Sequence, residues 1–118
     1  MITLGQKQRV FTRLLARLID YAYGAGYELT LGDAYRSPQQ AAANAAAGTG
    51  IRNSLHTQRL AIDLNLFAAG QYQTDSASYR ALGEFWESLS MPDYTCCWGG
   101  RFAKPDGNHF SIEHGGVR

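Results

Sequence analysis

The sequence lacks the features that attach a chain to a membrane or export it by a leader peptide. No run of apolar residues approaches the roughly 20 that are needed to cross a bilayer. The first fifteen residues, MITLGQKQRVFTRLL, do not show a positive end followed by an apolar stretch and a small-residue cleavage site. We therefore expect a soluble protein, made in the cytoplasm without a signal peptide and not inserted into a membrane.

An excess of one charge and a set of cysteines are also missing. The 11 basic and 10 acidic residues give a formal net charge of +1, so nothing favours a nucleic-acid partner. Arg9, Arg13 and Arg17 follow one helical stretch, and we interpret them as a solvated face. The only cysteines, Cys96 and Cys97, are neighbours, which cannot form an ordinary disulfide without strain and lack the CxxC spacing of zinc sites. We interpret them as small apolar residues of a strand.

The composition is that of one folded domain covering residues 1–118. It is 45% hydrophobic and 18% charged, which is ordinary for a globular protein. A chain of this length can bury one core but not two.

Three segments carry helix signals: residues 10–22, 37–47 and 76–90. In the first, apolar residues recur at helical spacing up to a stop at Gly24 or Gly26. In the second, Ser37 precedes a proline and is expected to cap the helix. In the third, an amphipathic pattern follows Ser76 or Ser78, either of which could be the cap.

Strand signals lie between these segments. Residues 27–36 alternate between apolar and polar, as a half-buried strand does. Residues 60–67 alternate more clearly, with four aliphatic side chains on one face and Asp63 on the other. The tail reads as two short strands around a loop that contains Lys104, Pro105 and Asp106. The order of elements predicts a small α+β domain, an antiparallel sheet with flanking helices.

The candidate chemistry lies on two of these strands. Asp63 sits within a strand, where an unpaired buried charge is costly, so it needs a partner. His56 precedes it across a turn, and His109 begins a strand that could lie alongside. Two imidazoles and one carboxylate form a three-ligand zinc set that leaves a position open for water. Asp106, three residues before His109, could then act as general base and acid.

Spacing alone leaves alternatives open. The patterns HxxxxxxD and DxxH occur by chance, and a single histidine is commonly a surface or core residue. His114 could be a ligand in place of His109, and Glu113 could orient a ligand imidazole. Trp98, which precedes two glycines, could line the cleft or belong to the core.

Three ordered motifs resemble peptidase family M15, the zinc D,D-/L,D-peptidases that include VanY-type carboxypeptidases, VanX-type dipeptidases and phage endolysins. They are SLHTQRLAID, then DGNHF, preceded upstream by DAYRSPQQ. The family pattern is SxHxxGxAxD, then [DE]xxH, with an arginine in an upstream R-S/T-x-x-Q segment. The matching residues are Ser54, His56, Ala61, Asp63, Asp106, His109, Arg36, Ser37 and Gln40. The match covers residues from about 27 to 112, and His109 is favoured over His114 because it has the family spacing.

The chain departs from the pattern at one position, where Arg59 replaces the glycine between His56 and Asp63. That glycine is structural, so the metal ligands remain, while the geometry of the turn is left open. An aspartate at position 106, in place of glutamate, resembles the phage L-alanyl-D-glutamate endopeptidases.

The resemblance implies a role for each site residue. One Zn²⁺ ion would be held by His56, Asp63 and His109. Asp106 would be the catalytic general base and acid. Arg36 would be catalytic and substrate-binding, because its fork of donors suits an oxyanion or a substrate carboxylate. Ser54 would also contact substrate.

The function expected from this resemblance is hydrolysis of the stem peptides of bacterial peptidoglycan, by a monomer. The most specific expectation is a phage or prophage endolysin that cuts L-Ala–D-Glu at the cell wall after release through a holin. A D-Ala-D-Ala carboxypeptidase is the alternative within the family. Two further alternatives are a non-catalytic zinc-containing binding module, as in the hedgehog signalling domain, and a metal-free α+β domain.

Overall fold

An antiparallel sheet of five strands separates two unlike sides of the molecule. The computed structural model describes residues 1–118. The strand order is β1-β2-β5-β4, and the short β3 pairs with the far end of β2. The strands are β1 (Tyr27–Leu31), β2 (Ala61–Ala68), β3 (Gln71–Tyr72), β4 (Cys96–Trp98) and β5 (His109–Ile112).

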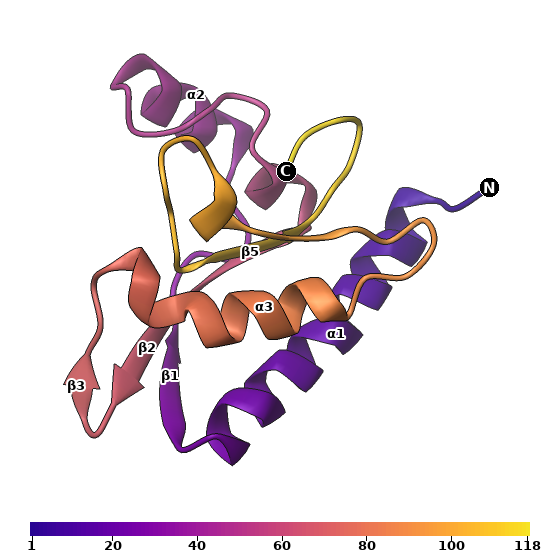
Figure 1. Ribbon diagram of the computed structural model, residues 1–118. Coiled ribbons are helices and arrows are strands. Elements are labelled where there is room, and N and C mark those ends of the chain that lie inside the picture. Colours follow the sequence, from indigo (N-terminus) through magenta and orange to yellow (C-terminus); the bar gives the residue numbers. More distant parts are fainter.

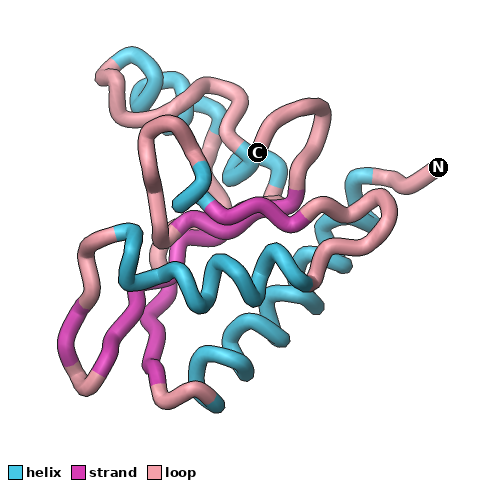
Figure 2. The backbone as a smooth tube through the Cα atoms, in the orientation of Figure 1, coloured by secondary structure: helices cyan, strands magenta, loops and turns pink.

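The helices divide between the two sides of the sheet. The α-helices are α1 (Leu4–Gly24), α2 (Pro38–Ala46) and α3 (Arg80–Ser88), and three short 3₁₀ helices are η1 (Leu55–Gln58), η2 (Ser76–Tyr79) and η3 (Gly99–Arg101). Helices α1 and α3 pack together against one face of the sheet, whereas α2 and several long loops lie beyond the other face (Figures 1 and 2). None of the helices combines the length and apolarity that a membrane span requires.

The hydrophobic core lies between the sheet and the pair α1/α3. The predicted aliphatic face of β2 is fully buried there, with Leu64 and Leu66 at 0% exposure. Trp86 of α3 meets Phe11 edge to face, with ring centroids 5.7 Å apart, and its Nε1 donates to the Ser111 carbonyl at 3.0 Å. Helix and sheet are thus joined by both apolar contact and a buried hydrogen bond.

The register of β2 and β5 decides what the other face carries. Ile62 pairs with Phe110, and both side chains enter the core. The next pair along the register is Asp63 with His109, which therefore share the opposite face. The side of the sheet without α1 and α3 thus receives the two strand-borne candidate ligands.

Most of the predicted elements are confirmed. Helix α1 ends at Gly24, and it begins earlier than the apolar pattern, at a capping box formed by Thr3 and Gln6. Ser37 caps α2, its Oγ accepting from the Gln40 N–H at 3.1 Å. Cys96 is buried in β4 as a free thiol, as expected, and burial raises its pKa to about 11.

Two predictions about helix 76–90 are wrong. The segment is split into η2 and α3, and neither serine caps it. The Oγ of Ser76 instead accepts from the Gly107 N–H at 2.9 Å, and Ser78 donates to Asp75. A contact with a loop 31 residues away thus uses the Ser76 side chain that was expected to cap the helix.

The sheet differs from prediction in two places. The first strand ends at Leu31, because residues 32–36 turn toward β2 and η1. The hairpin between β2 and β3 was not predicted. Its turn residues Ala69 and Gly70 both have positive φ, 51° and 75°, which is typical of a tight hairpin turn.

Candidate metal centre

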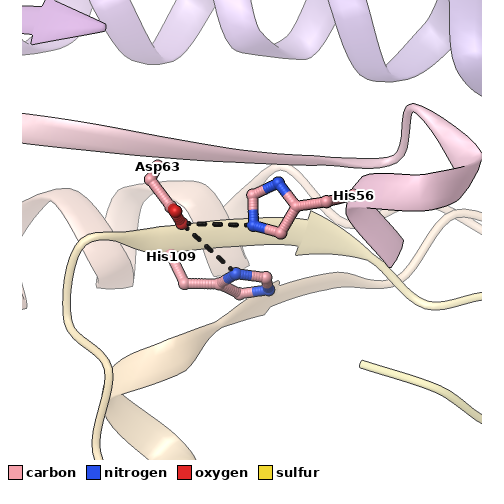
Figure 3. Close-up of side chains that lie close together, drawn as sticks. All are labelled: His56, Asp63 and His109. Atoms are coloured by element: carbon pink, nitrogen blue, oxygen red, sulfur yellow. Dashed lines mark ion pairs between the residues drawn. The ribbon is translucent and has the colours of Figure 1, made fainter. Parts of the chain in front are cut away.

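Three predicted ligands converge on one point. His56 Nε2 lies 3.3 Å from Asp63 Oδ1, and His109 Nδ1 lies 3.5 Å from the same oxygen (Figure 3). One donor atom from each residue lies within 4.8 Å of the other two. The carboxylate oxygen is therefore flanked by two imidazole nitrogens, from η1 and from β5.

The orientation of His56 is set by the backbone. The Oγ of Ser54 caps η1 by accepting from the His56 N–H at 3.3 Å. The ring Nδ1 lies 3.0 Å from the Ala34 carbonyl. Because a carbonyl can only accept, Nδ1 is the donor of this pair, and Nε2 is the ring nitrogen that remains for a metal ion. This is the arrangement that a metal-binding imidazole requires.

Asp63 is held as an anion. Burial by itself raises the pKa of Asp63, but contacts with His109 and His56 outweigh it and place the pKa well below its usual range. The carboxylate is therefore ionised at neutral pH, with 19% of its side chain exposed.

Residues 32–36 connect the ligands through main-chain hydrogen bonds. The Asp63 N–H donates to the Asp33 carbonyl at 2.8 Å, and the Arg36 N–H donates to the His56 carbonyl at 3.1 Å. This segment, expected to be the end of a strand, is instead a brace between β2 and η1. No sequence motif predicts these hydrogen bonds, because they are made by backbone atoms.

Arg36 is brought into the same cleft. Its side chain is 14% exposed, and Nη2 lies 3.0 Å from Asp33 Oδ2. Its Nε is buried without a hydrogen-bond partner. The guanidinium thus keeps an unused donor, and Asp33 is a neighbour that the sequence did not reveal.

Asp106 stands beside His109 on the loop before β5. Its carbonyl accepts from the His109 N–H at 3.1 Å, and its own N–H donates to the Gly99 carbonyl at 2.9 Å. A Cβ on Gly99 would lie 2.1 Å from the Asp106 carbonyl oxygen, so only glycine allows this approach. The Asp106 side chain is exposed to the cleft.

All the predicted site residues therefore lie around the same cleft. They line one cleft of about 510 Å³: Arg36, Ser54, His56, Asp63, Asp106 and His109. The alternatives are not at this place. His114 Nδ1 lies 3.3 Å from Lys7 Nζ, and Glu113 accepts from the Gly116 N–H at 2.9 Å. Trp98 is buried in the core and is not part of the cleft wall.

The turn between His56 and Asp63 keeps its geometry although Arg59 replaces the glycine of the family pattern. Arg59 has φ 55° and ψ 38°, the left-handed conformation in which glycine is favoured, and it ends η1. Its guanidinium carbon lies 4.1 Å from the centroid of the Tyr35 ring. The turn keeps a glycine-type backbone, and the cation–π contact offsets part of the strain.

The residues fit a metal ion. Asp63 Oδ1 is buried and accepts no hydrogen bond, although two imidazole nitrogens face it. An unsatisfied buried carboxylate oxygen is costly, and a cation at this point would satisfy it. Two imidazoles and one carboxylate suit zinc in particular.

Comparison with a known protein family agrees with two of the three motifs, and the upstream motif that contains Arg36 lies outside the matched residues. Residues 47–112 match the M15 family model described as D-alanyl-D-alanine carboxypeptidase. The matched region contains the three candidate ligands and Asp106. No curated protein sequence matches the chain.

Two solved structures share the fold. One is the L-Ala D-Glu endopeptidase ChiX of Serratia marcescens, with 19% identity and a TM-score of 0.70 over 89% of this chain and 79% of that one. The other is a mutant of the vancomycin-resistance D,D-pentapeptidase VanY in complex with Zn(II). It has 18% identity and a TM-score of 0.55 over 86% of this chain and 70% of that one. At these identities the likeness establishes the fold.

We predict that zinc binding depends on the three converging residues. Replacing His56 or His109 with Ala should weaken zinc binding by more than about 100-fold, because outer partners alone contribute 10- to 100-fold. His114→Ala is the matched control and should keep one zinc per chain. Elemental analysis after dialysis against limiting zinc measures this. Stoichiometric zinc in His56→Ala, or its loss in His114→Ala, would contradict the assignment.

We predict that Arg59→Gly changes the free energy of unfolding by less than about 1 kcal/mol. The glycine relieves left-handed strain but loses a cation–π contact of about 0.5–1 kcal/mol. Arg59→Ala keeps the strain and loses the contact, so it should be less stable than Arg59→Gly by about 1 kcal/mol. Urea unfolding of both variants measures the difference. Equal stabilities would mean that the backbone at residue 59 is not strained.

Proposed function

The chain belongs to peptidase family M15, by its match to the D-alanyl-D-alanine carboxypeptidase model, and on this premise we propose that it is a zinc-dependent peptidase of bacterial peptidoglycan. We propose that residues 1–118 form a single peptidase domain, which acts as a monomer on the stem peptides. The observation that carries the proposal is the convergence of His56, Asp63 and His109 in the cleft that also holds Asp106 and Arg36.

The proposed ligands of the single Zn²⁺ ion are His56 Nε2, Asp63 Oδ1 and His109 Nδ1. When bound, zinc lowers the pKa of a water molecule to about 7 and polarises a carbonyl. Ala34 supports this role of His56, because its carbonyl holds the tautomer that leaves Nε2 free.

Asp106 is proposed to move the proton. Its carboxylate is exposed to the cleft, and its main chain is tied to His109. It accepts the proton of the attacking water and passes it to the nitrogen of the leaving amine, as general base and then general acid. No hydrogen bond or ion pair occupies the Asp106 carboxylate, so it is free for this transfer.

Arg36 and Ser54 are proposed to bind the substrate. Arg36 lines the cleft and only one of its N–H donors is used, by Asp33, so the rest of its guanidinium fork can donate to a scissile carbonyl oxygen or a substrate carboxylate. Asp33 keeps the guanidinium in place through its ion pair. Ser54 lines the cleft next to His56, and its Oγ accepts a hydrogen bond from the His56 N–H.

The bond that we propose is L-Ala–D-Glu. The Serratia endopeptidase that shares the fold acts between L-Ala and D-Glu, and Asp106 agrees with the aspartate expected in that branch. A D-Ala-D-Ala carboxypeptidase is the second candidate, favoured by the description of the matching family model. The free carboxylate of Asp106 in the cleft argues for an enzyme over a zinc-containing binding module.

The biological setting that we propose is lysis of a bacterial wall. The enzyme would be an endolysin of a phage or prophage, made in the host cytoplasm and released to the wall through a holin. This setting is consistent with the absence of a membrane-spanning helix and with a peptidoglycan substrate.

We predict that Asp106→Asn keeps zinc and lowers kcat by about 10²- to 10⁴-fold, the usual contribution of a general base and acid. Asp20→Asn, on the exposed side of α1, is the matched control and should leave kcat unchanged. The assay is mass spectrometry of muropeptides with tetra- and pentapeptide stems, with a chelated sample beside it.

The products separate the candidates. Glycan that retains only L-Ala, together with a released peptide beginning at D-Glu, supports the endopeptidase. Loss of one terminal D-Ala supports the carboxypeptidase. Full activity of Asp106→Asn contradicts the role of Asp106, and no cleavage by zinc-loaded wild type would favour a binding module.

A further inference from the structure

Two cationic side chains in the cleft have no acidic partner. Lys104 and Arg118 line the same cleft as the candidate ligands, and neither takes part in an ion pair. Arg36 differs from them, because it is already paired with Asp33. The cleft also holds the carboxylates of Asp63 and Asp106, but neither of them forms an ion pair with Lys104 or Arg118, so both cations can pair with an anion from outside the protein.

Lys104 is carried by a loop that is held in place. It lies two residues before Asp106, with Pro105 restricting the backbone between them. Further along the loop, the Gly107 carbonyl accepts from Trp98 Nε1 at 2.7 Å, where the tryptophan is buried. The charge of Lys104 is thus carried on the same braced loop as the proposed proton carrier.

Arg118 comes from a different part of the chain and meets this loop at Phe102. Its guanidinium carbon lies 5.7 Å from the centroid of the Phe102 ring, and the aromatic ring lines the cleft as well. Arg118 thus brings a planar group with several donors to the cleft that Lys104 also lines.

We propose that Lys104 and Arg118 form an anion subsite that binds a substrate carboxylate on the leaving-group side of the scissile bond. The inference rests on the proposed function, since the stem peptide supplies the carboxylate. When the bond to L-Ala is cut, the leaving residue is D-Glu, which carries a carboxyl group that is not part of the cleaved bond. Asp106 is the proposed proton donor to the leaving amine, and Lys104 lines the same cleft on the same loop, so we place the carboxylate of the leaving residue at Lys104.

The electrostatic argument is specific to a charged group. Unpaired cations in a cleft attract anions, because the low-dielectric walls concentrate the field. A guanidinium and an ammonium bind a carboxylate by charge-assisted hydrogen bonds, but they gain much less from a neutral amide. The subsite therefore distinguishes D-Glu from its carboxamide, D-isoglutamine, which differs by one charge.

The test uses two synthetic stem peptides that differ only in this group, one with the free D-Glu carboxylate and one with the carboxamide. Zinc-loaded wild type should favour the carboxylate by about 10-fold or more in kcat/KM, mainly through KM. Lys104→Gln and Arg118→Gln should each reduce the preference, and the double variant should remove it. Arg13→Gln is the control, because it removes the same charge from the exposed side of α1 and should keep the preference.

A binding measurement separates this inference from the proposed function. Calorimetric titration of both peptides into zinc-loaded Asp106→Asn should show tighter binding of the carboxylate. Replacing both Lys104 and Arg118 with Gln in that background should abolish the difference. If wild type cleaves no stem but this difference is seen, the subsite stands and the peptidase fails. Equal kcat/KM and equal affinity for the two peptides, or a preference that survives in the double variant, would overturn the subsite.

Discussion

The pairing of Asp63 with His109 across β2 and β5 is the constraint on which the rest of the site depends. It places a carboxylate and an imidazole directly opposite each other on one face of a central pair of strands. A shift of one residue in either strand would send one of the two side chains into the hydrophobic core. The aliphatic side chains of β2, which enter that core, therefore set the register that the site requires.

The two faces of β2 thus serve different purposes. One face is covered by α1 and α3 and provides the packing that fixes the strands. The other face is covered only by short helices and loops, which leaves a cleft above the carboxylate. His56 reaches this cleft from η1, and residues 32–36 fasten η1 to β2 through backbone hydrogen bonds. A rigid sheet and a braced turn hold the three ligands, as a preorganised site requires.

The parts of the fold and site that could be predicted are those that depend on the pattern of side-chain types. The alternation of β2 indicated which face Asp63 occupies, and the motifs around His56 and His109 indicated that they belong together. The brace at residues 32–36 was not predicted, because main-chain hydrogen bonds can be made by almost any residue type. Arg59 could be noticed as a departure from the glycine pattern, but its left-handed backbone and its contact with Tyr35 could not. Segment 76–90 was misjudged because Ser76 bonds to a distant loop, a tertiary contact that local signals do not contain.

The measurement that tests the central claim most directly is the location of zinc by anomalous diffraction at the zinc absorption edge. We predict one peak at about 2.0–2.2 Å from His56 Nε2, Asp63 Oδ1 and His109 Nδ1. Asp106 should face the ion without being a ligand. A peak at His114 or at the cysteines, or a peak at the cleft that lacks one of the three ligands, would contradict the account.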